Sequence, residues 1–200
     1  MASVTRGAGA GATTANPDGG SQAVWNNPSL ITSDDGSYAT QQLSHFYGER
    51  GYNYLKASDF GFSIDSDQQI DGIEVIIERQ RVSGGAFGIT PFIKDDQILI
   101  LNGDGSAGVG STNRSANAEW ATSWTDVTFG SSSDSWGETW TPAKVNSSDF
   151  GVYIRCKGPS DPGGFASWGE YAYVDHVEIT IHHSDGASST GNPAFLLFVD

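Results

Sequence analysis

The chain contains one cysteine and few basic residues. A lone Cys156 cannot form an intrachain disulfide, which excludes a small disulfide-stapled scaffold. It lies in the strand-like run 152–157, and we expect an inert, half-buried thiol. Lys and Arg total 10 against 24 Asp and Glu, giving a formal charge of −14. Such a chain repels nucleic-acid phosphates and anionic lipid, so we expect neither nucleic acid nor a membrane as partner.

Long apolar runs are missing as well. No stretch approaches the roughly 20 apolar residues that cross a bilayer as a helix. The first residues carry one charge, Arg6, and no apolar segment, so we do not expect them to act as a secretory signal.

Catalytic and metal-binding signatures are equally scarce. Gly103 to Gly108 matches G-x-G-x-x-G, but no helix pattern follows, which favours a plain turn. Residues 65–71 alternate oxygen-bearing side chains without EF-hand spacing, which favours a solvated turn. Glu74 and Glu78 lie about 13 Å apart on a straight strand, beyond the separation of a glycosidase pair. The histidines do not cluster, and no nucleophile elbow is present. We expect no enzyme, no metal site and no cofactor.

What the chain does contain is repetition. Residues 58–64 (SDFGFSI) and 148–154 (SDFGVYI) are near copies, and residues 71–78 (DGIEVIIE) are echoed by 175–182 (DHVEITIH). Two similar strand pairs predict two related halves packed face to face. The 26 glycines and 23 aromatic residues suit short strands joined by tight turns.

The pattern of strands predicts the fold class. Apolar alternation indicates strands over 38–43, 52–64, 72–82, 97–101, 120–129, 150–157 and 173–183. A Thr-Pro start predicts one helical turn over 141–146, the only one expected. We predict an all-β fold: an antiparallel two-sheet β-sandwich, jelly-roll-like, with at most one short helix, over residues 22–186.

The two ends are predicted to lie outside this domain. Residues 1–21 are rich in Ala, Gly, Thr and Ser and are expected to form a flexible arm. Residues 187–200 read as a linker and an apolar C-terminal strand. Burying its five apolar residues is worth about 7–15 kcal/mol, so this segment must dock, either within its own chain or on a neighbour. The expected assembly residues are Phe195, Leu196, Leu197, Phe198 and Val199.

Aromatic residues near acids suggest a second kind of site. Trp136, Trp140, Trp168 and Tyr171 have Asp, Glu or Asn close by in the sequence, as a platform for sugar rings requires. The alternative is that these rings cap the ends of the sandwich as part of its core.

The chain resembles β-sandwich domains of tailed-phage structural proteins and related bacterial extracellular modules. The resemblance rests on eight segments spread over residues 23–182: 25–28, 35–39, 60–64, 70–75, 136–137, 140–143, 146–152 and 174–181. It implies a jelly-roll-like fold used for display, adhesion or shell reinforcement, and it carries over no catalytic residue.

Two functions therefore stand as expectations. The first is a non-enzymatic virion protein of a tailed phage, either a capsid cement (decoration) protein or a fibre or adaptor subunit. Its partners are other capsid or tail proteins and copies of itself, as a trimer or hexamer. The second is an extracellular carbohydrate-binding module with glycans as partners. The expected location is the virion, or the bacterial surface.

Overall fold

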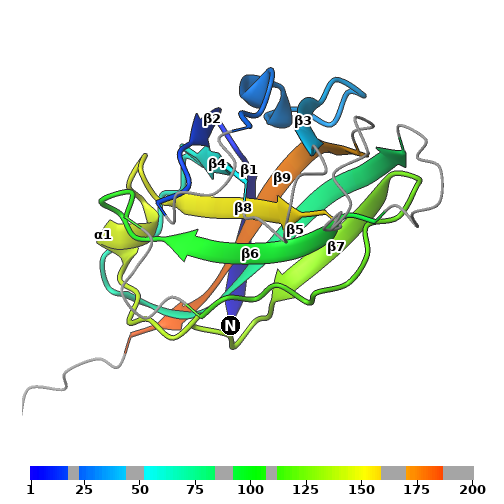
Figure 1. Cartoon of the computed structure of the whole chain (residues 1–200). Coiled ribbons are helices and arrows are strands. Elements are labelled where there is room, and N and C mark those ends of the chain that lie inside the picture. The colour runs from blue at the N-terminus through cyan, green and yellow to red at the C-terminus, as the bar shows by residue number, and fades with distance from the viewer. Residues whose placement is uncertain (18–22, 44–51, 84–91, 107–111, 159–169, 187–200) are drawn as a thin grey trace, which may run out of the picture.

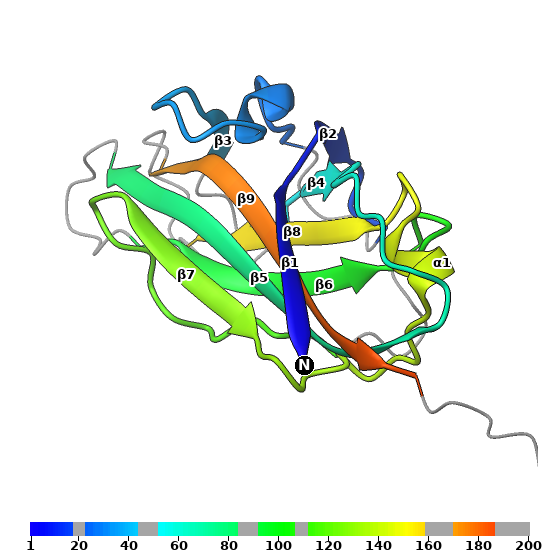
Figure 2. The same cartoon turned by 180° about the vertical axis from the view of Figure 1, so that it is seen from behind.

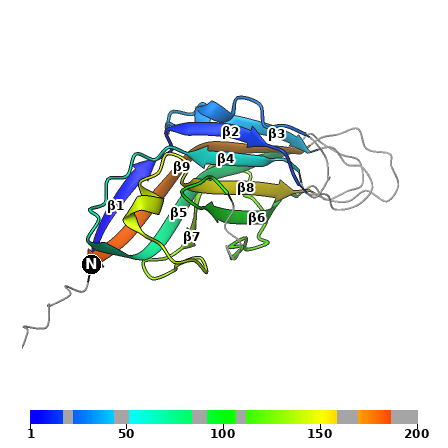
Figure 3. The same ribbon diagram turned by 90° about the vertical axis from the view of Figure 1, so that its left-hand side faces the viewer.

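The computed structural model describes residues 1–17, 23–43, 52–83, 92–106, 112–158 and 170–186, whose strands form two antiparallel sheets (Figure 1). The five-stranded sheet runs in the order β1 (Ala2–Gly7), β9 (Glu170–Asp185), β5 (Gln68–Ser83), β7 (Thr125–Gly130), with β3 (Ala39–Leu43) also paired to β9. The four-stranded sheet runs in the order β2 (Ala10–Thr14), β4 (Tyr54–Ser58), β8 (Gly151–Lys157), β6 (Lys94–Leu101). The predicted two-sheet antiparallel sandwich is confirmed, and Figure 3 shows its two layers.

The core lies between the sheets because inward residues alternate with outward ones along each strand. On β5, Ile73, Val75 and Ile77 are fully buried and pair with Ile181, Ile179 and Val177 of β9. The four-stranded sheet faces them with its own buried residues, which are Leu55, Ala57, Ile98, Ile100, Val152, Ile154 and Cys156. Each aliphatic side chain of this kind contributes about 1.5–3 kcal/mol on burial.

The internal echo does not mark two halves that face each other. The repeated segments 71–78 and 175–182 lie in β5 and β9, which are hydrogen-bonded neighbours in one sheet. The other repeated segments, 58–64 and 148–154, differ in structure. Residues 151–157 form β8, whereas Asp59 and Gly61 have φ of 59° and 64°, so the chain leaves the extended region after β4. The strand expected over 52–64 therefore ends at Ser58. Alternation alone missed this because left-handed φ values, which a Gly but also an Asp can adopt, override it.

Residues 1–17 do not form the expected flexible arm, because they carry two paired strands; residues 18–21 of that expectation lie outside the described residues. β1 adds an edge to the five-stranded sheet, from Ala2 opposite His183 to Gly7 opposite Glu178 (Figure 2). β2 then adds an edge to the four-stranded sheet along β4. The composition misled because backbone hydrogen bonds hold these strands, and small residues make them as well as large ones. At Gly11 a Cβ would lie 1.9 Å from the Pro28 carbonyl oxygen, so the tight fit favours glycine.

The predicted helical turn is confirmed as α1 (Pro142–Val145), where the Thr141 side chain accepts a hydrogen bond from the Lys144 amide. A 3-10 turn, η1 (Pro28–Ile31), was not predicted. No helix in the described part of the chain combines the length and apolar character needed to cross a membrane. The C-terminal assembly residues, 195–199, lie outside the described residues.

Candidate functional site

Two of the four aromatic residues proposed as a sugar platform belong to the core instead. Trp136 has no exposed surface, and its indole donates a 2.9 Å hydrogen bond to the Ile73 carbonyl. Trp140 is also buried, and its ring packs edge-on against Phe150 with centroids 5.5 Å apart. Both rings belong to the hydrophobic core, so the platform prediction is wrong for them. Trp168 lies outside the described residues.

Tyr171 does join an aromatic cluster, with partners that the sequence did not indicate. It lies on β9 beside Tyr173, with ring centroids 6.3 Å apart. Tyr38, just before β3, packs on Tyr173 at 4.5 Å, and Trp124, just before β7, lies 5.5 Å from Tyr38. All four side chains are half-buried, whereas Ala172 of β9 is fully buried. Successive side chains of a strand point to opposite faces, and Tyr171 and Tyr173 flank the buried Ala172 on β9. The aromatic cluster therefore covers the outer face of the five-stranded sheet.

The hydroxyl group of Tyr173 is influenced by those of its two tyrosine neighbours. The pKa of Tyr173 is raised above the ordinary tyrosine value, first by partial burial and then by the neighbouring Tyr38 and Tyr171. At neutral pH Tyr173 therefore keeps its proton and can donate a hydrogen bond. A surface of apolar ring faces edged by hydroxyl donors is suited to a ligand that is itself apolar on one side and polar at its rim.

A polar pocket of about 320 Å³ adjoins the aromatic cluster on the same face. Its lining residues are Asp34, Ile76, Glu78, Asp126, His176 and Glu178. Three strands carry all of them except Asp34, which lies between η1 and β3: Glu78 of β5 pairs with His176 of β9 on one side and with Asp126 of β7 on the other. Gln80, two residues beyond Glu78, pairs with Tyr173, so the aromatic cluster and the pocket are successive positions along the sheet.

A β-bulge shapes the junction between the two. Glu78 pairs with His176, but Arg79 pairs with Val174, so Asp175 is an extra residue on β9. Bulges re-aim side chains next to functional sites. Here Asp175 is 3% exposed, and its Oδ2 accepts a 3.0 Å hydrogen bond from the Gly36 amide. The segment that leads to β3 is thereby held beside β9, where Thr32 also forms a bridge to His176.

The acids of this pocket perturb one another. The pKa of Glu78 is raised, mainly by burial and then by Asp34, Asp175 and Asp126, while His176 lowers it. The pKa of Asp175 is raised mainly by burial, against the hydrogen bond from Gly36 that lowers it. Spacing along the chain predicts only a solvent-facing carboxylate at Glu78. The signal that was missed is the matching register of Glu78, His176 and Asp126 on three strands, which sequence spacing does not contain.

The outer face of the four-stranded sheet holds a second pocket, of about 260 Å³. Tyr54 of β4 and Tyr153 of β8 line it, with ring centroids 4.9 Å apart. The Arg155 guanidinium lies 4.9 Å from the Tyr54 ring and donates to Asp96 at 2.6 Å and to Asn16 at 2.8 Å. These polar groups bind one another, so this pocket presents mainly apolar surface to a ligand.

The acid-rich segment 65–71 is only partly the predicted solvated turn: residues 65–67 form an exposed turn, whereas residues 68–71 begin β5. The Gln68 amide bonds to the Asp65 carbonyl, and Asp71 accepts hydrogen bonds from Gln69 and Ser184. Among the described residues, the carboxylates that do converge come from elsewhere in the chain: Asp34, Glu78 and Asp175.

Comparison with known proteins yields only distant similarity. No protein-family model and no curated protein sequence matches the chain. The CBM22-1 xylan-binding domain of Paenibacillus barcinonensis Xyn10C is similar over 92% of this chain and 95% of its own, with 10% identity and a TM-score of 0.38. A chain of infectious bursal disease virus, Gx strain, is similar over 94% of this chain and 37% of its own, with 13% identity and a TM-score of 0.20. Similarity at this level carries no argument about function.

Proposed function

We propose that this protein is a non-enzymatic carbohydrate-binding module that holds a glycan on the outer face of its five-stranded sheet. One observation carries the proposal: the half-buried rings of Tyr38, Trp124, Tyr171 and Tyr173 gather on that face, directly beside a polar pocket. Sugar rings have apolar C–H faces and a rim of hydroxyl groups. The aromatic cluster supplies apolar contact, and the carboxylates of the pocket supply hydrogen-bond acceptors.

Trp124 makes the proposal directly measurable. The other tryptophans in the described part of the chain, Trp25, Trp120, Trp136 and Trp140, are all buried, while Trp124 is half-buried. We expect tryptophan emission to change when the full-length chain is titrated with soluble glycans from a broad panel. The change should vanish in Trp124→Phe, whose smaller ring keeps the apolar contact, while calorimetry still detects binding.

Substitutions on the two outer faces locate the site. Tyr173→Ala and Trp124→Ala should each lower the affinity for the glycan by about tenfold, equivalent to about 1.4 kcal/mol of lost apolar contact. Tyr153→Ala removes a ring of the same kind from the other sheet and should leave affinity unchanged. Loss of binding in Tyr153→Ala alone would move the site to the second pocket, and silence of the wild type across the panel would refute glycan binding.

A virion assembly role is the second candidate, as a cement protein or a fibre subunit. One feature favours it: β7 is the last strand of its sheet in the described part of the chain and pairs there only with β5. An open edge can accept a strand from a neighbouring molecule. The apolar segment 195–199 is the expected donor. The two functions are compatible, because a virion protein can also hold a glycan.

A further inference from the structure

Three carboxylates from separate parts of the chain converge beside the aromatic cluster. Asp34 comes from the segment between η1 and β3, Glu78 from β5 and Asp175 from the bulge of β9. One oxygen atom of each lies within 4.8 Å of one oxygen of each of the others. Like charges at this separation repel one another strongly unless something neutralises them.

The buried member of this acid cluster has an oxygen with no partner. Asp175 is 97% buried, given its 3% exposure, and its Oδ1 accepts no hydrogen bond from any described residue. The Oε2 atom of Glu78 is also buried and has no hydrogen-bond partner among the described residues. A buried carboxylate oxygen without a donor or a cation is costly, and native structures rarely leave one. Two such atoms in one acid cluster indicate a ligand that supplies positive charge.

The protein's own cations do not fill this role in the described structure. The ion pairs formed among described residues include none of Asp34, Glu78 and Asp175. Asp35 and Asp126 add further negative charge nearby, and each raises the pKa of a member of the acid cluster. His176 has the opposite effect and lowers the pKa of Glu78. Within the described residues, no ion pair offsets the repulsion among these three carboxylates.

We propose that Asp34, Glu78 and Asp175 bind a calcium ion. All three ligands are hard carboxylate oxygens, and His176 is not among the converging atoms, which disfavours zinc. Calcium accepts six to eight oxygens in irregular geometry, whereas magnesium demands a near-octahedral site. Asp34 and Glu78 line a pocket of about 320 Å³, which leaves room for water to complete a calcium shell.

Binding has a structural consequence for the neighbouring aromatic cluster. Asp34 and Tyr38 belong to the same short segment, and Asp175 and Tyr173 belong to the same strand. A calcium ion shared by Asp34 and Asp175 fastens that segment to β9 and fixes Tyr38 against Tyr173, 4.5 Å away. The calcium site stands without the glycan proposal, because it rests on the acids alone.

The test is calorimetric titration of CaCl₂ into the chelator-treated full-length chain, with thermal unfolding alongside. We expect saturable binding with one ion per chain. At a hundredfold excess of calcium over the dissociation constant, the unfolding midpoint should rise by about 5–10 °C. MgCl₂ at the same concentration should give a smaller rise. No binding heat and no shift in the wild type would overturn the proposal.

Matched variants at Asp34 and Asp175 assign the ion to the acid cluster. Asp175→Asn and Asp34→Asn should abolish the calcium-induced shift, and the apo Asp175→Asn chain should be at least as stable as the apo wild type, because repulsion is relieved while an amide oxygen can still accept from Gly36. Glu74→Gln removes one negative charge from β5, the strand of Glu78, at a position outside the acid cluster. Asp67→Asn removes one negative charge from the exposed turn before β5. Both should keep the shift. A shift retained in Asp175→Asn, or lost in Asp67→Asn, overturns this site, and neither result bears on glycan binding.

Discussion

Arg79 and Asp95 form a buried ion pair that joins the two sheets of the sandwich. Arg79 projects inward from β5 and Asp95 from β6, and Arg79 Nη2 donates to Asp95 Oδ2 at 3.0 Å. The guanidinium lies 4.6 Å from the ring centroid of Trp120, whose indole also donates to Asp95 at 3.0 Å. Charge, ring stacking and hydrogen bonding therefore act together on this buried pair, and Arg79 Nε is the one guanidinium nitrogen left without a hydrogen-bond partner among the described residues.

Breaking this pair should destabilise the fold more than any surface charge does. Arg79→Met leaves the Asp95 carboxylate buried without its cation, and we expect a loss of about 3–5 kcal/mol in the free energy of unfolding by urea. Lys56→Met removes a cation from a partly exposed pair with Asp149 and should cost under about 1 kcal/mol. Equal effects of the two substitutions would mean that the inter-sheet pair contributes little.

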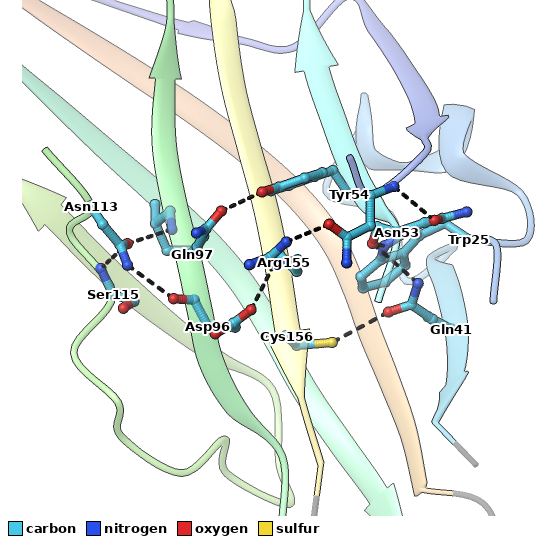
Figure 4. Close-up of polar contacts among 12 residues, drawn as sticks. Trp25, Gln41, Asn53, Tyr54, Asp96, Gln97, Asn113, Ser115, Arg155 and Cys156 are labelled. Carbon is cyan, nitrogen blue, oxygen red and sulfur yellow. Dashed lines mark hydrogen bonds and ion pairs between the residues drawn. The ribbon is translucent and has the colours of Figure 1, made fainter. Parts of the chain in front are cut away.

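Cys156 should be chemically inert in the folded protein. It is fully buried, its thiol donates to Gln41 Oε1 at 3.4 Å, and its pKa is raised by burial first and then by Asp95 (Figure 4). Thiolate, the reactive form, is thus suppressed while access is blocked. We expect no reaction with a disulfide reagent such as DTNB in native buffer, and one thiol per chain after unfolding. Rapid reaction in native buffer would contradict both the burial and the raised pKa.

The sequence predicts those features of the fold that depend on neighbouring residues better than those that depend on residues far apart in the chain. Alternation placed Ile73, Val75 and Ile77 inward on β5, and the cap signal at Thr141 located α1, because both are local. The expected flexible arm was wrong because β1 depends on backbone pairing with β9, some 175 residues away in the chain, where Thr5 Oγ1 lies 2.7 Å from Thr180 Oγ1.

The candidate site was even less accessible to sequence reasoning. Tyr171 was selected because acids lie near it in the chain, but its ring neighbours come from β9 and from the residues before β3 and β7. The same criterion selected Trp136, which the fold buries completely. An acid cluster built from Asp34, Glu78 and Asp175 has no spacing that a motif can express. A bulge at Asp175, which alternation does not anticipate, brings its members together.

Close carboxylates raise the question of hydrolysis, and we predict none. Retaining glycosidases use two accessible carboxyl groups about 5–5.5 Å apart on either side of the bond. Here a third acid, Asp175, is 97% buried, given its 3% exposure, and converges on Asp34 and Glu78, an arrangement better suited to a cation than to a sugar ring. Incubation with any glycan that binds should release no reducing ends above buffer, with a known glycoside hydrolase as positive control. Release that disappears in Glu78→Gln would establish an enzyme instead.

Assembly through the C-terminal segment remains a prediction, and the native mass of the full-length chain tests it. Residues 195–199 are five large apolar residues, and exposing them to water costs enough that we expect docking on a neighbouring copy or shell protein. Light scattering should give a closed oligomer, a trimer or hexamer, and deletion of 191–200 should reduce it to a monomer with an unchanged unfolding midpoint. Leu197→Asp, which keeps the chain length, should act like the deletion because a charge cannot enter an apolar interface unpaired. A truncated chain that assembles normally would exclude this mechanism, whereas a truncated monomer with a sharply lower midpoint would show that the segment packs within its own chain.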